Sequence, residues 1–233
     1  MKRWIALLML ALPLASLAGE YEQSLLVETG KIREGDLQVR NVTDLGSSMT
    51  CLAFYIRTSG TSPIIYCYPA ASGLGANLRQ VDHLKSDDLV IRKLEDTKNK
   101  MSCLVAYIST PGTSPAVDCY PYKQRFKDHM AEAGHLREGD LDVRRIIDSG
   151  NKKTCLVAYV RTEGTAPSVI CYDSEAGIKG GLYQSSLLKA GDLVVRKITD
   201  TVSKKSCLVT YVSTAGTSAH LYCYDEGKTA VQP

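Results

Sequence analysis

The chain has 233 residues and eight cysteines, with 28 lysines and arginines against 25 aspartates and glutamates. This length is enough for one large or two small domains with a substantial apolar core. The net charge of only +3 speaks against binding to nucleic acid or membranes through bulk charge.

Residues 1–18 have the pattern of a signal peptide. Lys2 and Arg3 precede the apolar run Trp4–Leu14, and small residues follow up to Ala18. Such a segment is cleaved on export, here expected after Ala18, and its apolar run is too short to span a bilayer. We therefore expect an exported protein without a membrane span, either periplasmic or secreted to the cell surface.

The cysteines follow a strict period. Within each pair the two are 16 residues apart, and successive pairs are 52 residues apart. An even number of cysteines in an exported chain indicates disulfides, each expected to stabilise the fold by about 3 kcal/mol. A zinc site is disfavoured, because no Cys-x-x-Cys occurs and the histidines do not repeat with the cysteines. The predicted bridges are Cys51–Cys67, Cys103–Cys119, Cys155–Cys171 and Cys207–Cys223.

Other residues recur at the same spacing of 52. Each unit contains an Asp-Leu pair, an arginine, a second aspartate, a Cys-Leu-x-x-Tyr segment, a Thr-x-Gly-Thr group and a closing tyrosine. Repeats of this size are typical of arrays, solenoids and propellers. The predicted units are residues 19–70, 71–122, 123–174 and 175–226, followed by a polar tail at 227–233.

Each unit reads as a run of short antiparallel strands. In the first unit these are Asp36–Thr43, Cys51–Arg57, which is apolar on both faces, and Ile64–Tyr68. A further strand is expected upstream, joined by the tight turn Glu34-Gly35. In the third unit that region, Lys127–Leu136, is equally compatible with a short helix.

The loop between the two cysteine strands has two readings. If Cys51 lies opposite Cys67, a three-residue hairpin places Gly60 in the left-handed region. In the second unit, Thr110–Thr113 reads instead as a type II turn, which needs a bulge near Pro115 to realign the cysteines. Both readings stay open at this point.

The predicted fold is all-β, with four tandem antiparallel repeats of about 52 residues. Isolated units of this size bury too little surface to be stable alone, so we expect them to pack together. A four-bladed, propeller-like ring would place the Cys-Leu-Val strand inside each sheet. The alternative is two β domains of two repeats each.

The sequence indicates no enzyme, cofactor or metal site. Gly-x-Ser-x-Gly, His-Glu-x-x-His, Walker A and Gly-x-Gly-x-x-Gly motifs are all missing. His220 lies in a closing strand where the other units carry Ile64, Ala116 and Ser168, which favours a strand-surface role over catalysis.

The repeated polar residues are the candidate binding residues. The arginines either form cross-strand ion pairs that fix the packing of the units or converge on an anionic ligand. The closing tyrosines serve packing or a recognition face. These residues are Arg40, Arg92, Arg144, Arg196, Tyr68, Tyr120, Tyr172 and Tyr224.

The expected function is that of an exported, non-enzymatic binding or surface-attachment module. It would recognise a cell-surface, polysaccharide or protein partner through four similar sites, and not nucleic acid. The first alternative is a structural envelope protein or self-assembling subunit, and the second is a secreted hydrolase or protease inhibitor.

Overall fold

The computed structural model describes residues 26–70, 76–122, 129–173 and 180–225, and all regular elements within these ranges are β-strands. The predicted signal peptide, residues 1–18, and the predicted tail at 227–233 lie outside the described residues. The first sheet consists of β1 (Leu26–Glu34), β2 (Leu37–Asp44), β3 (Met49–Ile56) and β4 (Ile64–Pro69). The second consists of β5 (Leu78–Ser86), β6 (Leu89–Asp96), β7 (Met101–Ile108) and β8 (Ala116–Pro121). The third consists of β9 (Met130–Glu138), β10 (Leu141–Asp148), β11 (Lys153–Val160) and β12 (Ser168–Asp173). The fourth consists of β13 (Leu182–Ala190), β14 (Leu193–Asp200), β15 (Lys205–Val212) and β16 (His220–Asp225).

Each unit forms one four-stranded antiparallel meander, with strands paired in chain order. The upstream strand predicted from the sequence is present in every unit and forms a tight hairpin with the Asp-Leu strand, as in the pairing of Glu34 with Leu37. The helix considered for Lys127–Leu136 is wrong where the structure describes it, because Met130 onward belongs to β9 and pairs with β10. The four all-β repeats are therefore confirmed.

All four predicted disulfides are present, and their Cα atoms are 4.0 to 4.1 Å apart. Cys51 lies directly opposite Cys67, and Cys103 lies opposite Cys119 in the same way. The loop that joins β3 to β4 is longer than either predicted turn, because the strands end at Ile56 and resume at Ile64. Gly60 has a φ of 79° there, as the left-handed position requires, and Gly112 has 82°. The second unit pairs without a shift, so no bulge near Pro115 is needed.

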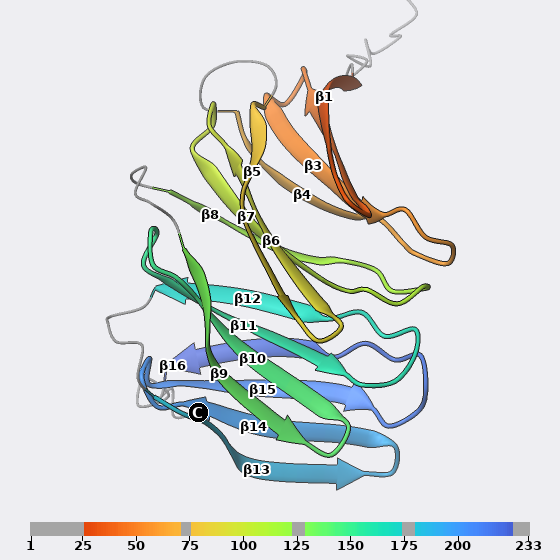
Figure 1. Cartoon of the computed structure of the whole chain (residues 1–233), viewed down its shortest axis with the longest axis vertical. Coiled ribbons are helices and arrows are strands. Elements are labelled where there is room, and N and C mark those ends of the chain that lie inside the picture. Colours follow the sequence, from red (N-terminus) through yellow and green to blue (C-terminus); the bar gives the residue numbers. More distant parts are fainter. Residues whose placement is uncertain (1–25, 71–75, 123–128, 174–179, 226–233) are drawn as a thin grey trace, which may run out of the picture.

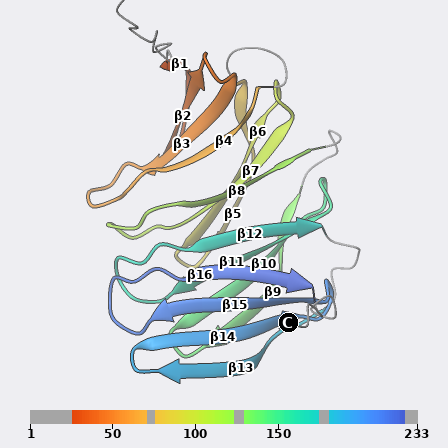
Figure 2. The same ribbon diagram turned by 180° about the vertical axis from the view of Figure 1, so that it is seen from behind.

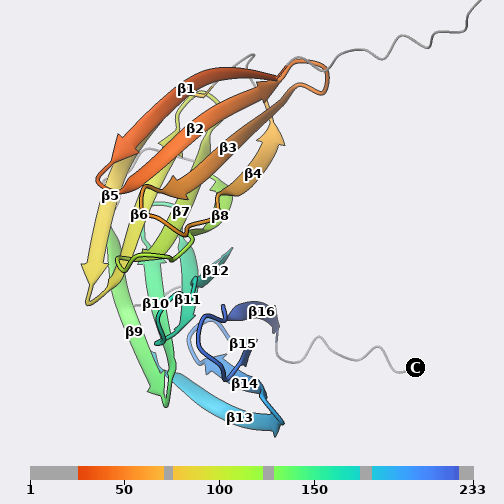
Figure 3. The same ribbon diagram turned by 90° about the vertical axis from the view of Figure 1, so that its right-hand side faces the viewer.

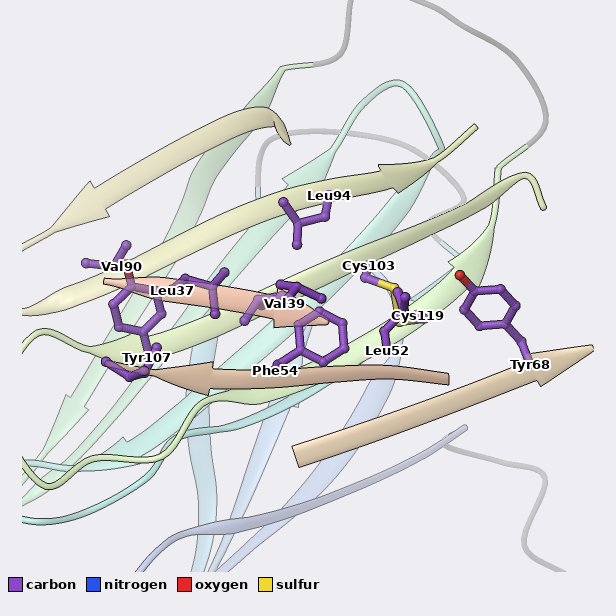
Figure 4. Close-up of a cluster of buried hydrophobic side chains, with 12 residues drawn as sticks. Leu37, Val39, Leu52, Phe54, Tyr68, Val90, Leu94, Cys103, Tyr107 and Cys119 are labelled. Atoms are coloured by element: carbon purple, nitrogen blue, oxygen red, sulfur yellow. A yellow bond between two sulfur atoms is a disulfide. The ribbon is translucent and has the colours of Figure 1, made fainter. Parts of the chain in front are cut away.

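The four sheets stack face to face in chain order (Figures 1 and 2). We call the face of each sheet that carries its disulfide the front face and the opposite one the back face. In every contact the back face of one sheet packs against the front face of the next. Figure 4 shows Leu52 and Phe54 from the back face of the first sheet beside Cys103 and Tyr107 from the front face of the second.

Three apolar cores fill the three spaces between sheets. The first joins sheets one and two, the second joins sheets three and four, and a third joins sheets two and three. The two-domain alternative is therefore not seen, because the middle core links the two pairs of units. The strand β7 is buried on both faces, from Cys103 to Tyr107, as its sequence predicted.

The stack resembles successive propeller blades but does not close into a ring. The first and fourth sheets lie at opposite ends of the molecule (Figures 1 and 3). The second and third sheets are covered on both faces. Among the described residues, the front face of the first sheet and the back face of the fourth have no neighbouring sheet.

Candidate functional site

The four predicted arginines occupy one equivalent position on the front face of each sheet. Arg92 Nε donates a hydrogen bond to Tyr107 Oη at 3.0 Å, and its Nη1 donates to Gln80 Oε1 at 2.6 Å. The equivalent trios are Arg40 with Tyr55 and Glu28, Arg144 with Tyr159 and Glu132, and Arg196 with Tyr211 and Gln184. Each arginine is held by its own sheet, so the structure distributes the four along the stack and does not bring them together in a ring.

Two of these arginines also clamp the preceding sheet. Arg144 Nη2 donates to Asp87 Oδ2 at 2.8 Å, in the turn between β5 and β6. Arg196 Nη2 lies 3.7 Å from Asp140 Oδ1 in the turn between β9 and β10, and Tyr211 Oη donates to the same oxygen at 2.7 Å. The cross-strand ion pairs expected from the sequence are present for Arg40 and Arg144, whereas Arg92 and Arg196 bond to glutamines at that position. The contacts with the preceding turn also join one sheet to the next.

At the first contact, Arg92 approaches the turn between β1 and β2. A Cβ on Gly35 would lie 2.8 Å from Arg92 Nη2, and Gly35 has a φ of 59°. The left-handed backbone therefore favours glycine at this position, and the close approach shows how near the guanidinium lies to the turn. The arginines of the second, third and fourth sheets all reach the turn of the sheet before them.

Three of the four predicted tyrosines are packed between sheets. Tyr68 Oη donates to Asp96 Oδ2 at 2.8 Å, Tyr120 Oη to Asp148 Oδ2 at 2.8 Å, and Tyr172 Oη to Asp200 Oδ2 at 2.9 Å. In each pair the tyrosine lies on a back face and the aspartate on the next front face. These three tyrosines therefore form joints inside the molecule and not an exposed recognition face.

A buried cation accompanies two of the three joints. Lys93 Nζ lies 2.7 Å from Asp148 Oδ2, and Arg145 Nη1 lies 2.9 Å from Asp200 Oδ1, with all four side chains almost completely buried. The equivalent position in the first unit is Asn41, which is also fully buried. This position was not among the predicted site residues. Its signal in the sequence is that it carries a cation in three units and a neutral residue in one, directly after the repeated arginine: Asn41, Lys93, Arg145 and Lys197.

The joints are electrostatically coupled. Burial acts to raise the pKa of Asp148, but hydrogen bonds from Lys93, Asn151 and Tyr120 outweigh it and the pKa is lowered. The pKa of Asp200 is lowered in the same way, against burial, by Ser203, Tyr172 and the charge of Arg145. Burial and the neighbouring carboxylate raise the pKa of Tyr120 well above its usual value. The Tyr120–Asp148 and Tyr172–Asp200 joints therefore each combine an ionised aspartate with a neutral tyrosine that donates to it.

The Thr-x-Gly-Thr loops form a row along one edge of the stack, to the right in Figure 1. Within each loop the second threonine donates back to the end of the preceding strand, as Thr61 Oγ1 does to the Ile56 carbonyl at 2.8 Å. Neighbouring loops are also connected: the Ser62 amide donates to Ser114 Oγ at 2.8 Å and the Ala166 amide donates to Ser218 Oγ at 3.2 Å. The row is thus a regular set of similar, hydroxyl-rich loops.

A cleft of about 420 Å³ opens where the second and third sheets meet this edge. Its rim carries exposed charges of both signs, with Asp87, Asp88 and Glu163 against Arg137 and Arg161. Tyr159 and Thr165 line its interior. The mixture of charged groups, hydroxyls and an aromatic ring suits a polar ligand better than an apolar one.

The histidines do not form part of a repeated site. His135 Nε2 lies 3.0 Å from Asp142 Oδ2, and His220 is exposed on the back face of the fourth sheet. Within the described ranges, no group of three or more His, Cys, Asp or Glu is placed to hold a metal ion. The same ranges contain no helix long and apolar enough to cross a membrane.

Comparison with protein-family models, with curated proteins and with solved structures finds no match to this chain. Its function has to be inferred from its own geometry.

Proposed function

We propose that the protein is an exported, non-enzymatic binding module that attaches to a repetitive cell-surface partner, such as a polysaccharide or an envelope protein. The observation that carries this proposal is the row of four equivalent loops on one edge of the stack. Most of the repeated Arg, Tyr and Asp residues at the internal contacts hold the sheets together, whereas the Thr-x-Gly-Thr loops are a repeated feature that stays largely exposed. The four disulfides favour an oxidising compartment.

The spacing of the loops provides the physical basis. Four similar loops on one edge of a rigid stack can contact a repetitive polymer at the same time, and each additional contact is then intramolecular. Weak contacts at single loops would in this way add up to useful avidity. The cleft between the second and third loops adds charged and aromatic groups to the row.

The proposal is tested by a binding screen of the disulfide-bonded protein against immobilised glycans and cell-surface fractions. The variant Arg161→Ala with Glu163→Ala changes the rim of the cleft. The matched control, Lys152→Ala with Asp173→Ala, removes one cation and one anion from the third sheet at the ends of the strands that lie away from the loop row. We expect the cleft variant to bind at least tenfold more weakly and the control to bind like the parent protein. Equal binding by all three proteins, or no binding to any surface, would overturn the proposal.

A further inference from the structure

The two ends of the stack carry most of the exposed apolar side chains of the described residues. Eight large hydrophobic residues are exposed there, and seven of them lie on the two faces without a neighbouring sheet. Leu26 and Ile65 lie on the front face of the first sheet. Tyr183, Leu188, Leu193, Val212 and Tyr222 lie on the back face of the fourth. Concentrated exposure of this kind marks an interaction surface.

The same repeat positions are buried at the internal contacts. Leu193 is 45% exposed, whereas its equivalents Leu37, Leu89 and Leu141 are at most 1% exposed. Val212 is 38% exposed, whereas Ile56, Ile108 and Val160 are at most 7% exposed. Terminal units of stacked repeat proteins normally carry a polar outer face. The fourth unit has instead kept the residues of an internal unit.

Polar groups at the two ends also match each other as they do inside the stack. Tyr224 is the fourth member of the series Tyr68, Tyr120 and Tyr172, and it lies on the back face of the fourth sheet. Asp44 is the first member of the series Asp96, Asp148 and Asp200, on the front face of the first sheet. The turn that follows Asp44 already orients its carboxylate. The Gly46 amide donates to Asp44 Oδ1 at 3.0 Å, and Ser47 Oγ donates to Asp44 Oδ2 at 2.7 Å.

The charged residues on the back face of the fourth sheet also complement those on the front face of the first sheet. Lys197 occupies the position of Lys93 and Arg145, on the back face that would meet Asp44, and its Nζ lies 5.9 Å from the ring centre of Tyr224. Arg40 and Tyr55 on the front face occupy the positions of Arg196 and Tyr211, which bind Asp140 of the preceding turn. The equivalent of Asp140 in the fourth unit is Asp192. Each end therefore carries one cationic and one anionic half of the internal contact.

We propose that these two faces bind each other in different copies of the chain. The back face of the fourth sheet of one copy packs against the front face of the first sheet of the next, in the geometry that already joins successive sheets. A second copy is the occupant that these faces fit, because the contact continues an interface that the molecule forms three times internally. The contact is head-to-tail, and each added copy leaves both kinds of face free at the ends. Such heterologous contacts produce linear assemblies unless the rotation closes a ring.

The test uses two neighbouring leucines on the exposed edge strand β13. Leu188 pairs with Val195 on the back face, and Leu187 pairs with Arg196 on the front face, although the two are similarly exposed, at 59% and 44%. Leu188→Glu places a charge in the proposed contact, and Leu187→Glu is its matched control. Both substitutions introduce the same charge into the edge strand β13. If copies associated by pairing their edge strands, both substitutions would therefore weaken association equally.

Sedimentation velocity of the disulfide-bonded chain over a range of concentrations measures the outcome. We expect the parent protein and Leu187→Glu to form a concentration-dependent series of dimers and longer oligomers. Leu188→Glu should weaken association at least tenfold. A strictly monomeric parent protein at every concentration, or an equal effect of the two substitutions, would overturn the proposal. Glycan binding by the loop row does not enter this measurement, so the two proposals fail independently.

Discussion

The contact between the first and second sheets and the contact between the second and third share one framework but differ at several buried positions, among them Asn41 and its equivalent Lys93. Both have an apolar core and a tyrosine that donates to an aspartate at 2.8 Å. In the first contact the position is the buried Asn41, whose side-chain amide has no hydrogen-bond partner among the described residues. In the second it is Lys93, which forms an ion pair with Asp148. The difference shows that apolar packing and the tyrosine–aspartate bond define the contact. The cation is an addition that makes one contact depend on charge.

The largest expected effect comes from removing that cation. Lys93→Met leaves a buried aspartate without its ion-pair partner and should lower the free energy of unfolding by about 3 kcal/mol. Asn41→Met at the equivalent position removes a buried amide and should be neutral or raise the free energy of unfolding by about 1 kcal/mol. Denaturant unfolding with the disulfides intact measures both. Similar losses in the two variants would show that the two contacts do not differ as described.

A smaller effect, equal in both contacts, is expected from the tyrosine hydroxyls. Tyr68→Phe and Tyr120→Phe each remove one hydrogen bond to an aspartate and should each cost about 2 kcal/mol. The same unfolding measurement applies. A loss confined to Tyr120→Phe would mean that the bond matters only where the cation is present, which contradicts a common framework.

The smallest expected effect is a difference between variants in how much folding stability they lose at acidic pH. The pKa of Asp148 is lowered in the folded protein, because hydrogen bonds from Lys93, Asn151 and Tyr120 outweigh its burial. A carboxyl group with a lowered pKa stabilises the fold above its unfolded pKa of about 4, and this contribution is lost as the pH falls through its folded pKa. Asp118 works in the opposite direction, because burial raises its pKa.

Thermal unfolding between about pH 2 and pH 6 should therefore show that the parent protein loses stability as the pH falls. In Asp148→Asn the decrease in stability with falling pH should be smaller. Asp44→Asn is the control at the equivalent position on the uncovered front face of the first sheet, where a hydrogen bond from Ser47 lowers the pKa of the carboxyl group. It should change the slope less than Asp148→Asn does. A steeper acid loss in Asp148→Asn would reverse the predicted sign.

The strict period made the units, the disulfides and the hairpins predictable. Cys51 and Cys67 had to pair within one unit, and Gly60 and Gly112 marked the loops that reverse the chain. The joints between units were not predictable, because Tyr68 and Asp96 are each repeated but nothing local indicates that they meet. The ring was expected because four equivalent blades can close, yet closure depends on the rotation between sheets, which residue spacing does not encode. The placement of Arg144 and Arg196 against the turn of the preceding sheet follows from the same unpredicted geometry.

The central claim is that one contact joins all sheets and that the two ends of the molecule are its separated halves. It is tested most directly by mixing two proteins, each blocked at one end. Leu188→Glu blocks the back face of the fourth sheet, and Ile65→Glu blocks the front face of the first. We predict that each variant alone is monomeric by sedimentation and that the mixture forms a one-to-one heterodimer and nothing larger. A mixture that stays monomeric, or a dimer formed by either variant alone, would contradict the account.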